Sequence, residues 1–312
     1  MFHIVKLPYF PEYEHKIIAP ARMPIAYSSY YNGSVESLLQ ILKSSKDNRI
    51  ALLGIPFDNN SSYMKGPADA PPLIRQALYC DSSNLWTENG TNLEQAPWLD
   101  AGDLDFASEM EPFSEIEKGV STILEHGLSP ISLGGDHSIT YPVLKAFHRS
   151  GLRFSILHFD AHPDLYDELQ GNRYSHACPF ARILEEGLTN RLVQIGIRTA
   201  NAHQREQAKR FGVKMIEMRE WQNGMTPHFD GPLYVSIDLD VLDPAYAPGV
   251  SHHEPGGMTT RELIAAIQGI RDRVIGADIV EFNPKRDPLG ITAMTAAKIL
   301  KELLAKMLDG TA

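Results

Sequence analysis

The sequence predicts an α/β protein with a mostly parallel sheet that is covered by helices on both faces. From about residue 50, short apolar runs rich in β-branched residues recur, which is typical of buried strands. Segments with apolar residues at i, i+3, i+4 and i+7 lie between several of these runs and indicate helices. Strands that alternate with helices favour parallel pairing, because a crossover helix returns the chain to the same edge of the sheet.

The elements can be placed in order along the chain. The expected strands are residues 49–58, 128–136, 152–160, 191–199, 232–240 and 274–283. The expected helices are residues 71–80, 114–127, 141–151, 178–187, 259–270 and 294–308. Residues 1–48 contain proline, tyrosine and charge without a clear period, so they are interpreted as an N-terminal extension. No repeat or long linker divides residues 49–312, which are therefore predicted to form a single domain.

Composition limits the classes of partner. The formal net charge of −10 disfavours nucleic acid and anionic membranes and suits a small cationic substrate. The sequence has no run of 18 apolar residues and no signal-peptide pattern, so a soluble, cytoplasmic protein is expected. Its two cysteines, Cys80 and Cys178, are predicted to be unpaired thiols.

Metal-ligating residue types follow three of the predicted strands. In parallel sheets the carboxyl ends of the strands meet at one edge, where functional crevices form. The candidates, which are the kinds of side chain that bind divalent cations, are His137, Asp160, His162, Asp164, Asp238 and Asp240. Their alternate spacing would place Asp160, His162 and Asp164 on one side for as long as the chain stays extended, and the same holds for the last two aspartates. The alternative is an ordinary polar strand end, or carboxylates paired with Arg or Lys.

The charge of this set indicates two metals. Four aspartates carry a charge that two divalent cations would balance, and buried carboxylates without a cation would be costly. Oxygen-rich ligands with one imidazole per metal favour Mn²⁺, although Ni²⁺, Co²⁺ or Fe²⁺ could fit. Two such metals can share and activate a water molecule, which predicts hydrolysis.

Three segments carry a resemblance to a known family. GGDHS, DAHPD and SIDLDVLDPAYAPG are similar to the signature segments of the ureohydrolases, which are the arginases, agmatinases and related guanidino-compound hydrolases. The resemblance runs from about Ile50 to the C-terminus. It implies a three-layer α/β/α sandwich with a binuclear manganese site, assembled as a homo-oligomer of three or six chains. It also implies an enzyme that cleaves a guanidino carbon–nitrogen bond and releases urea and an amine.

The resemblance also implies individual roles for the metal ligands. Asp160 and Asp238 would bridge both metals. His137 and Asp164 would complete one metal, and the remaining pair, His162 and Asp240, the other. Asp164 would also accept a hydrogen bond from the bridging hydroxide.

Two further residues match the family outside the ligand set. His176, in GNRYSHACPF, would contact the substrate and pass a proton to the leaving amine, although on its own it could be a surface loop histidine. Glu254, in SHHEPGGMT, would grip the guanidinium, although on its own it could be a turn residue.

The loops favour agmatine as substrate, which would yield putrescine and urea. GNRYSHACPF and EPGG resemble agmatinases and guanidino-acid hydrolases more than arginases. The chain departs from the family at Ala177-Cys178 and at the tandem His252-His253, which either are tolerated loop variants or reshape specificity. In the second case the substrate would be arginine, a guanidino acid, formiminoglutamate or guanidine.

Several polar residues are interpreted as structural. His158 is expected to be a satisfied core histidine, and Asp136 and Ser138 to support the loop of His137. Asp103 and Asp105 are interpreted as loop acids.

Rival functions fit less well. A zinc deacetylase would not need so many ligands, and a binuclear phosphoesterase should show a GNH(E/D) motif, which is absent. An inactive homologue that binds or regulates a partner would normally have lost a ligand or the proton donor.

Overall fold

The computed structural model describes residues 32–33, 35–43, 47–106, 111–222 and 225–310. Within this part of the chain, nine strands form one sheet in the order β1-β3-β2-β4-β9-β8-β5-β6-β7, and every neighbouring pair is parallel. The strands are β1 (Asn32–Gly33), β2 (Ile50–Ile55), β3 (Trp98–Leu104), β4 (Ser129–Gly134), β5 (Ser155–Phe159), β6 (Arg191–Ile197), β7 (Lys214–Glu217), β8 (Leu233–Asp238) and β9 (Val274–Val280).

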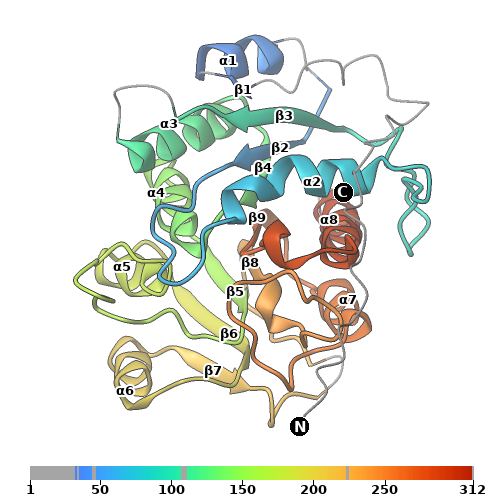
Figure 1. Cartoon of the computed structure of the whole chain (residues 1–312). Coiled ribbons are helices and arrows are strands. Elements are labelled where there is room, and N and C mark those ends of the chain that lie inside the picture. Colours follow the sequence, from blue (N-terminus) through green and yellow to red (C-terminus); the bar gives the residue numbers. More distant parts are fainter. Residues whose placement is uncertain (1–31, 34, 44–46, 107–110, 223–224, 311–312) are drawn as a thin grey trace, which may run out of the picture.

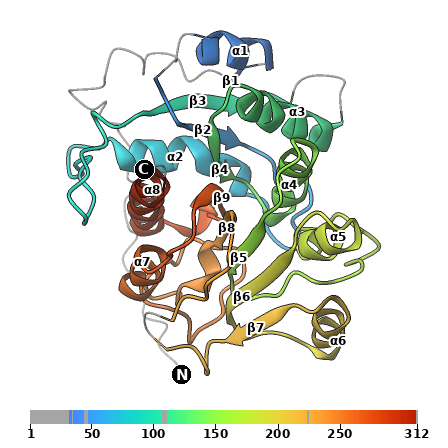
Figure 2. The same cartoon turned by 180° about the vertical axis from the view of Figure 1, so that it is seen from behind.

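Helices cover both faces of this sheet, which confirms the predicted three-layer α/β/α sandwich (Figures 1 and 2). The helices are α1 (Val35–Lys43), α2 (Ala70–Leu78), α3 (Pro112–Glu125), α4 (Thr140–Arg149), α5 (Pro179–Glu185), α6 (Ala202–Phe211), α7 (Thr260–Gln268) and α8 (Ile291–Asp309). Helices α2, α7 and α8 pack on one face, and α1, α3, α4, α5 and α6 lie on the other. Each face encloses its own cluster of buried apolar side chains, so the central strands are buried on both sides.

The six predicted strands and six predicted helices all form, with ends within a few residues of those expected. Strands β1, β3 and β7 and helices α1 and α6 were not predicted. Helix α6, AHQREQAKRF, has few apolar residues. Its first turn is stabilised by polar side chains, because Asn201 and Gln204 form a reciprocal capping box. The periodicity that reveals an amphipathic helix is therefore weak in this segment.

Strand β3 corrects the interpretation of Asp103 as a loop acid. Asp103 lies within the strand, buried, where its carboxylate accepts a hydrogen bond from the buried guanidinium of Arg75 in α2. A charged residue inside a strand interrupts the apolar pattern from which strands are predicted. Burial of the Asp103 carboxylate would be costly without its partner, Arg75, which lies on another element.

The described part of the predicted extension belongs to the folded unit. Residues 32–33 pair with β3 as its edge strand, and residues 35–43 form α1, whose Leu38 and Leu42 are buried in the core that contains α3. Residues 1–31 lie outside the described residues. No helix in the described ranges combines the length and the apolar character that a membrane span requires.

The order of the strands determines where the candidate site lies. Strands β4, β9, β8 and β5 are neighbours at the centre of the sheet, and each ends in a segment that carries a candidate site residue. The loops after β2 and β4 are held together at Gly135, where an added Cβ would lie 1.8 Å from the carbonyl oxygen of Phe57. The backbone N–H of Asp136 donates to that carbonyl at 2.9 Å, so a glycine is needed for this close approach.

Candidate metal centre

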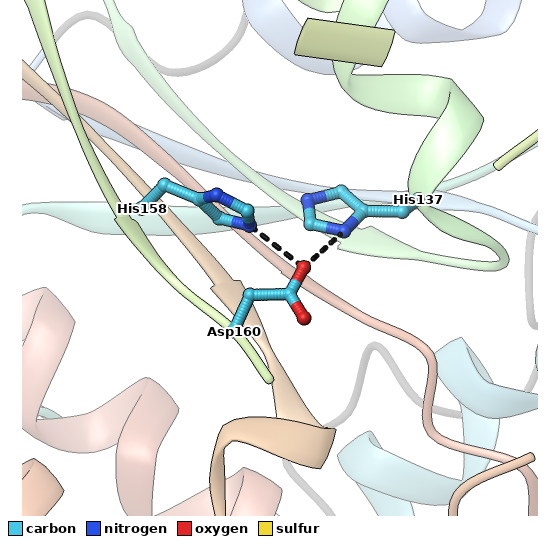
Figure 3. Close-up of side chains that lie close together, drawn as sticks. All are labelled: His137, His158 and Asp160. Carbon is cyan, nitrogen blue, oxygen red and sulfur yellow. Dashed lines mark hydrogen bonds and ion pairs between the residues drawn. The ribbon is translucent and has the colours of Figure 1, made fainter. Parts of the chain in front are cut away.

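The structure brings all six predicted metal ligands together at the carboxyl ends of β4, β5 and β8. Around His137, carboxylate oxygens of Asp160, Asp164 and Asp238 lie 3.3, 3.0 and 3.2 Å from the ring atom Nδ1. These four side chains are buried. Figure 3 shows the imidazole of His137 directed at one carboxylate oxygen of Asp160.

A second group of ligand atoms lies on the other side of the same carboxylate. Nδ1 of His162 is 3.5 Å from Oδ1 of Asp160 and 2.9 Å from Oδ2 of Asp240. Asp160 therefore faces His137 with Oδ2 and His162 with Oδ1. One carboxylate between two ligand groups is the arrangement that a bridged pair of cations requires.

The backbone at these strand ends differs from the extended chain that the alternate spacing suggested. Strand β5 ends at Phe159, before the first ligand, and Asp164 has a positive φ of 51°. Strand β8 ends at Asp238, and the next three residues, 239–241, form a short 3₁₀ helix that carries Asp240. The carboxylate of Asp238 caps this turn by accepting a hydrogen bond from the N–H of Asp240 at 2.8 Å. Tight turns, rather than an alternating strand, thus aim the ligands.

A hydrogen-bond chain sets the tautomer of His137 and shows that the centre fits a cation. Ser236 donates its hydroxyl proton to Oδ1 of Asp278 at 2.6 Å, so its oxygen accepts the Nε2–H of His137 at 3.0 Å. The other ring nitrogen, Nδ1, is then the atom that can bind a metal; it is buried, makes no hydrogen bond and faces three carboxylates. A ring nitrogen and carboxylates at this distance repel one another unless a proton or a metal cation lies between them.

His158 has the structural role that the sequence suggested, and it also positions a ligand. The side-chain amide of Gln194 donates to the carbonyl of Pro163 at 2.6 Å, which requires its nitrogen to face that group. The same nitrogen donates to Nδ1 of His158 at 3.0 Å, so Nε2 of His158 carries the proton and donates to Oδ2 of Asp160 at 2.8 Å. Figure 3 shows His158 and His137 on either side of this oxygen. His158 thus orients Asp160 rather than offering a lone pair.

Burial and crowding make two of the ligand carboxylates, Asp238 and Asp240, difficult to ionise without a cation. Burial, followed by the charges of Asp240 and Asp160, raises the pKa of Asp238 well above its usual range. Burial also raises the pKa of Asp240 to about 6, with the charge of Asp160 adding to it and His162 opposing it. Divalent cations would remove this cost, so the donor set fits two of them.

His176 and Glu281 form a buried pair in the same pocket. Nδ1 of His176 lies 2.8 Å from Oε1 of Glu281, and Nε2 lies 2.8 Å from the hydroxyl of Ser62. Burial lowers the pKa of His176, but the charge and hydrogen bond of Glu281 outweigh it and raise this pKa to about 9. Oε1 of Glu281 also accepts the backbone N–H of His137 at 2.9 Å. His176 is therefore a cation beside the metal ligands, as a proton donor must be.

Glu281 also lines this pocket, although the sequence analysis only included it in the expected strand 274–283 and assigned it no role. It follows β9 directly, and its φ of 65° is in the left-handed region, which non-glycine residues rarely adopt. The resemblance instead indicated Glu254. Glu254 is not among the described side chains that line the pocket, and its backbone carbonyl accepts hydrogen bonds from Arg198 at 2.9 and 2.6 Å. Its binding role stays a prediction.

The two sequence departures contribute one residue each to the pocket. Ala177 and His252 line it, and the ring of His252 lies 5.3 Å from that of His176. Cys178 is fully buried beneath the loop, where burial raises the pKa of its thiol to about 12, and no disulfide forms. His253 instead lies 2.6 Å from the carbonyl of Pro248.

A small network supports the loops of His137 and His176, as expected for Asp136 and Ser138. Asp136 accepts hydrogen bonds from Ser138 N–H at 3.1 Å and from Asn60 N–H at 3.0 Å. Asn60 in turn accepts the backbone N–H of His176 at 3.1 Å. The loops after β2, β4 and β5 are thereby held to one another around the pocket.

The fold and the site define a class: an α/β/α hydrolase with a binuclear metal centre at the carboxyl edge of a parallel sheet. Comparison with known proteins gives the same result. The profile of the Arginase family matches residues 48–305. Arginase 1, mitochondrial, of Arabidopsis thaliana is 45% identical over 289 residues, which cover 86% of this chain and 84% of that protein. An agmatinase of Bacillus anthracis is 32% identical, with 89% and 98% covered.

Solved structures agree with these relatives. The structure of an arginase from Medicago truncatula superposes with a TM-score of 0.82 at 40% identity, covering 88% of this chain and 95% of that one. A formimidoylglutamase from Bacillus subtilis gives a TM-score of 0.75 at 27% identity, with 85% and 88% covered. The chain belongs to the arginase family and is a ureohydrolase-type enzyme whose His and Asp clusters are suited to a binuclear metal centre.

Proposed function

We propose that the protein hydrolyses L-arginine to L-ornithine and urea with two Mn²⁺ ions per chain. The observation that carries the hydrolytic part is that the other five ligands gather around Asp160, with Nδ1 of His137 facing three carboxylates. The preference for arginine is supported by the relatives, since arginases of several plants are 44–45% identical and the agmatinase 32%. The set of imidazole and carboxylate donors suits Mn²⁺.

The metals, when bound, would supply a nucleophilic water at neutral pH and offset the carboxylate charge. The protein's own side chains would orient the water, bind the guanidinium and donate the proton. Asp164, 3.0 Å from His137, is placed to accept a hydrogen bond from the attacking water. Oε1 of Glu281 is occupied by His176 and the N–H of His137, whereas Oε2 makes no hydrogen bond within the described residues. Oε2 is thus the atom for the substrate guanidinium, whose charge it would complement.

His176 supplies the proton that the leaving amine needs. At neutral pH its imidazolium carries protons on both nitrogens, with Nδ1 committed to Glu281. The proton on Nε2, which faces the hydroxyl of Ser62, is the one available to the δ-nitrogen of arginine as its bond to the guanidino carbon breaks. Water provides the hydroxyl group of the intermediate, and the products are urea and ornithine.

Agmatine is the second candidate substrate. The segments GNRYSHACPF and EPGG resemble agmatinases, and the Bacillus anthracis relative is named for that activity. Agmatine lacks only the carboxylate of arginine, so the two compounds differ at one end of the pocket.

The test is urea release by purified, manganese-loaded protein from arginine, agmatine, guanidinobutyrate, guanidinopropionate and guanidine. Ammonia from formiminoglutamate is followed in parallel, and the assay is repeated with Ni²⁺ and Co²⁺. The highest kcat/KM is expected for arginine with Mn²⁺. Failure to hydrolyse any of these compounds, with two metals per chain confirmed by elemental analysis, would refute the proposal.

The same assay tests the predicted role of Glu254 in binding the guanidinium. If Glu281 holds the guanidinium, KM rises in Glu281→Gln; if Glu254 does, it rises in Glu254→Gln. The trimeric or hexameric assembly expected for the family stays a prediction, which light scattering of the purified protein would test.

A further inference from the structure

Arg198 follows strand β6 directly, and its side chain binds the backbone of the turn that carries the metal ligand Asp240. One terminal nitrogen, Nη2, donates to the carbonyl oxygen of Asp240 at 2.6 Å, and the other, Nη1, donates to that of Val241 at 3.3 Å. Carbonyl groups at the end of a short helical turn lack partners within the turn, and a guanidinium can satisfy several of them at once. Arg198 thus holds this turn without being a metal ligand.

The same guanidinium holds a second loop against the turn. Nε and Nη2 of Arg198 donate to the carbonyl oxygen of Glu254 at 2.9 and 2.6 Å. Glu254 belongs to the loop that carries His252 into the pocket. An arginine can reach two carbonyls in fixed directions with its planar array of donors, which the single ammonium group of a lysine cannot reproduce. One side chain therefore links the turn of Asp240 to this loop.

The backbone of Arg198 holds the other ligand segment of the same metal group. Its N–H donates to the carbonyl oxygen of Ala161 at 2.9 Å, and Ala161 lies between Asp160 and His162 in the chain. The N–H of Ala161 donates in turn to Oδ1 of Asp240 at 3.1 Å. These bonds close a ring that runs from the backbone of Arg198 through Ala161 and Asp240 back to the guanidinium.

The ring sets the direction of the Asp240 carboxylate. Because Oδ1 accepts the N–H of Ala161, Oδ2 faces Nδ1 of His162, at 2.9 Å. Within the described part of the chain, the hydrogen bonds of Arg198 go to this ring, to the neighbouring loop and to its own strand, and none goes to the segment of His137. The ring therefore supports one group of metal ligands and leaves the other untouched.

We propose that Arg198 is a positioning residue for one of the two metals, the one whose unshared ligands are His162 and Asp240. It contacts neither metal nor substrate in this scheme and acts through the backbone of the ligands. The proposal goes beyond the proposed function, since it needs the binuclear centre but does not depend on which substrate is used. Outer-shell partners of metal ligands typically change metal affinity by about 10- to 100-fold.

Two substitutions at Arg198 test this role. Arg198→Met keeps an unbranched apolar stem and removes every side-chain donor, whereas Arg198→Lys keeps the positive charge and loses the planar array. In competition with a chelator, one of the two Mn²⁺ dissociation constants should rise at least about tenfold in both variants, more in Arg198→Met, and the other should stay unchanged. At limiting Mn²⁺, elemental analysis should find about one metal per chain. Saturating Mn²⁺ should restore most of the lost kcat.

The other end of the same strand offers a matched control. Arg191 is the first residue of β6, and its Nη1 also donates to a backbone carbonyl, that of His228, at 3.1 Å. It lies at the amino end of the strand, whereas the metal centre lies at the carboxyl ends. Arg191→Met should leave both Mn²⁺ dissociation constants unchanged.

Ligand variants identify which metal Arg198 supports. His162→Ala already lacks a ligand of that metal, so adding Arg198→Met should not weaken the binding of the metal that remains. His137→Ala removes a ligand of the other metal, so adding Arg198→Met should weaken the binding of the one that is left. A dependence on Arg198 in the His162→Ala protein but not in the His137→Ala protein would contradict the assignment.

Thermal unfolding of the metal-free proteins separates positioning from a general loss of stability. Arg198→Lys without metal should unfold close to the temperature of the wild type, because the affected bonds matter most when a metal must be bound. A large drop in that temperature without selective loss of one Mn²⁺, equal loss of both ions, or wild-type affinity for both would each overturn the proposal. Selective loss of one Mn²⁺ in a protein that hydrolyses no guanidino compound would keep the role of Arg198 and refute the proposed function alone.

Discussion

Nδ1 of His176 lies 2.8 Å from Oε1 of Glu281, and both side chains are buried in the metal pocket. The two residues come from the loop after β5 and the end of β9, 105 residues apart in the chain. The pair has a consequence for pH dependence, because Glu281 keeps His176 protonated where a free histidine would be neutral.

Activity should fall as the pH rises through about 9, the pKa of His176, because only its protonated form can supply a proton to the leaving amine. The stability of the folded protein should also fall as the pH rises. The pKa in the folded protein lies above the usual 6.5, so the stabilisation is complete below that value and is lost as the pH rises through about 9. In Glu281→Gln, burial is no longer opposed by this charge, and the alkaline limb of kcat should move to lower pH. Ser62→Ala removes only a neutral partner and should leave the limb in place. Identical limbs in wild type and Glu281→Gln would exclude His176 as the titrating group.

Metal content should separate the shared ligand from the unshared ones. His162→Ala removes a ligand from one group, so the variant should keep about one metal per chain and lose its activity. The carboxylate of Asp160 faces both groups, so Asp160→Ala should lose both metals. Asp238→Ala should likewise abolish activity and lose at least one metal. Elemental analysis after gel filtration gives the stoichiometry. His126→Ala, at the end of α3, serves as the control and should keep two metals. A one-metal variant with full turnover would contradict the binuclear mechanism.

The serine that sets the tautomer of His137 provides a matched pair of variants. Ser236 and Ser132 flank Asp278 on the neighbouring strands β8 and β4 and are both fully buried, but the hydroxyl of Ser132 makes no hydrogen bond. Ser236→Ala should weaken metal binding about 10- to 100-fold, because the Nε2–H of His137 loses its acceptor. Ser132→Ala should leave metal affinity unchanged. Competition with a chelator measures both constants, and equal affinities in the two variants would argue against the tautomer relay.

The buried guanidinium of Arg75 should matter for stability rather than activity. It donates to Asp100 at 2.8 and 2.9 Å and to Asp103, joining α2 to β3. Arg75→Met leaves these carboxylates without a partner and should lower the free energy of unfolding by about 3 kcal/mol. Arg149→Met breaks an ion pair in which the arginine is 67% exposed and should cost less than about 1 kcal/mol. Urea denaturation measures the difference, and similar losses in both variants would contradict it.

Much of the architecture could be predicted from local patterns. The central strands are apolar along their whole length, and the helices between them show a clear period, so both were placed correctly. Helix α6 was missed because its start depends on the side chains of Asn201 and Gln204 rather than on apolar spacing. Strand β3 was missed because Asp103 needs Arg75, which lies on another element.

By itself, the sequence determined the class of chemistry: six ligands in three motifs at strand ends, and a net ligand charge that calls for two cations. Only the tertiary structure decided that β4, β9, β8 and β5 are neighbours, that Asp160 is shared, and that Glu281 lines the pocket. The physical reason is that spacing along a strand constrains side chains only while the backbone stays extended. The extended backbone of β5 ends at Phe159, and that of β8 ends at Asp238. Beyond those points, hydrogen bonds between residues far apart in the chain aim each group.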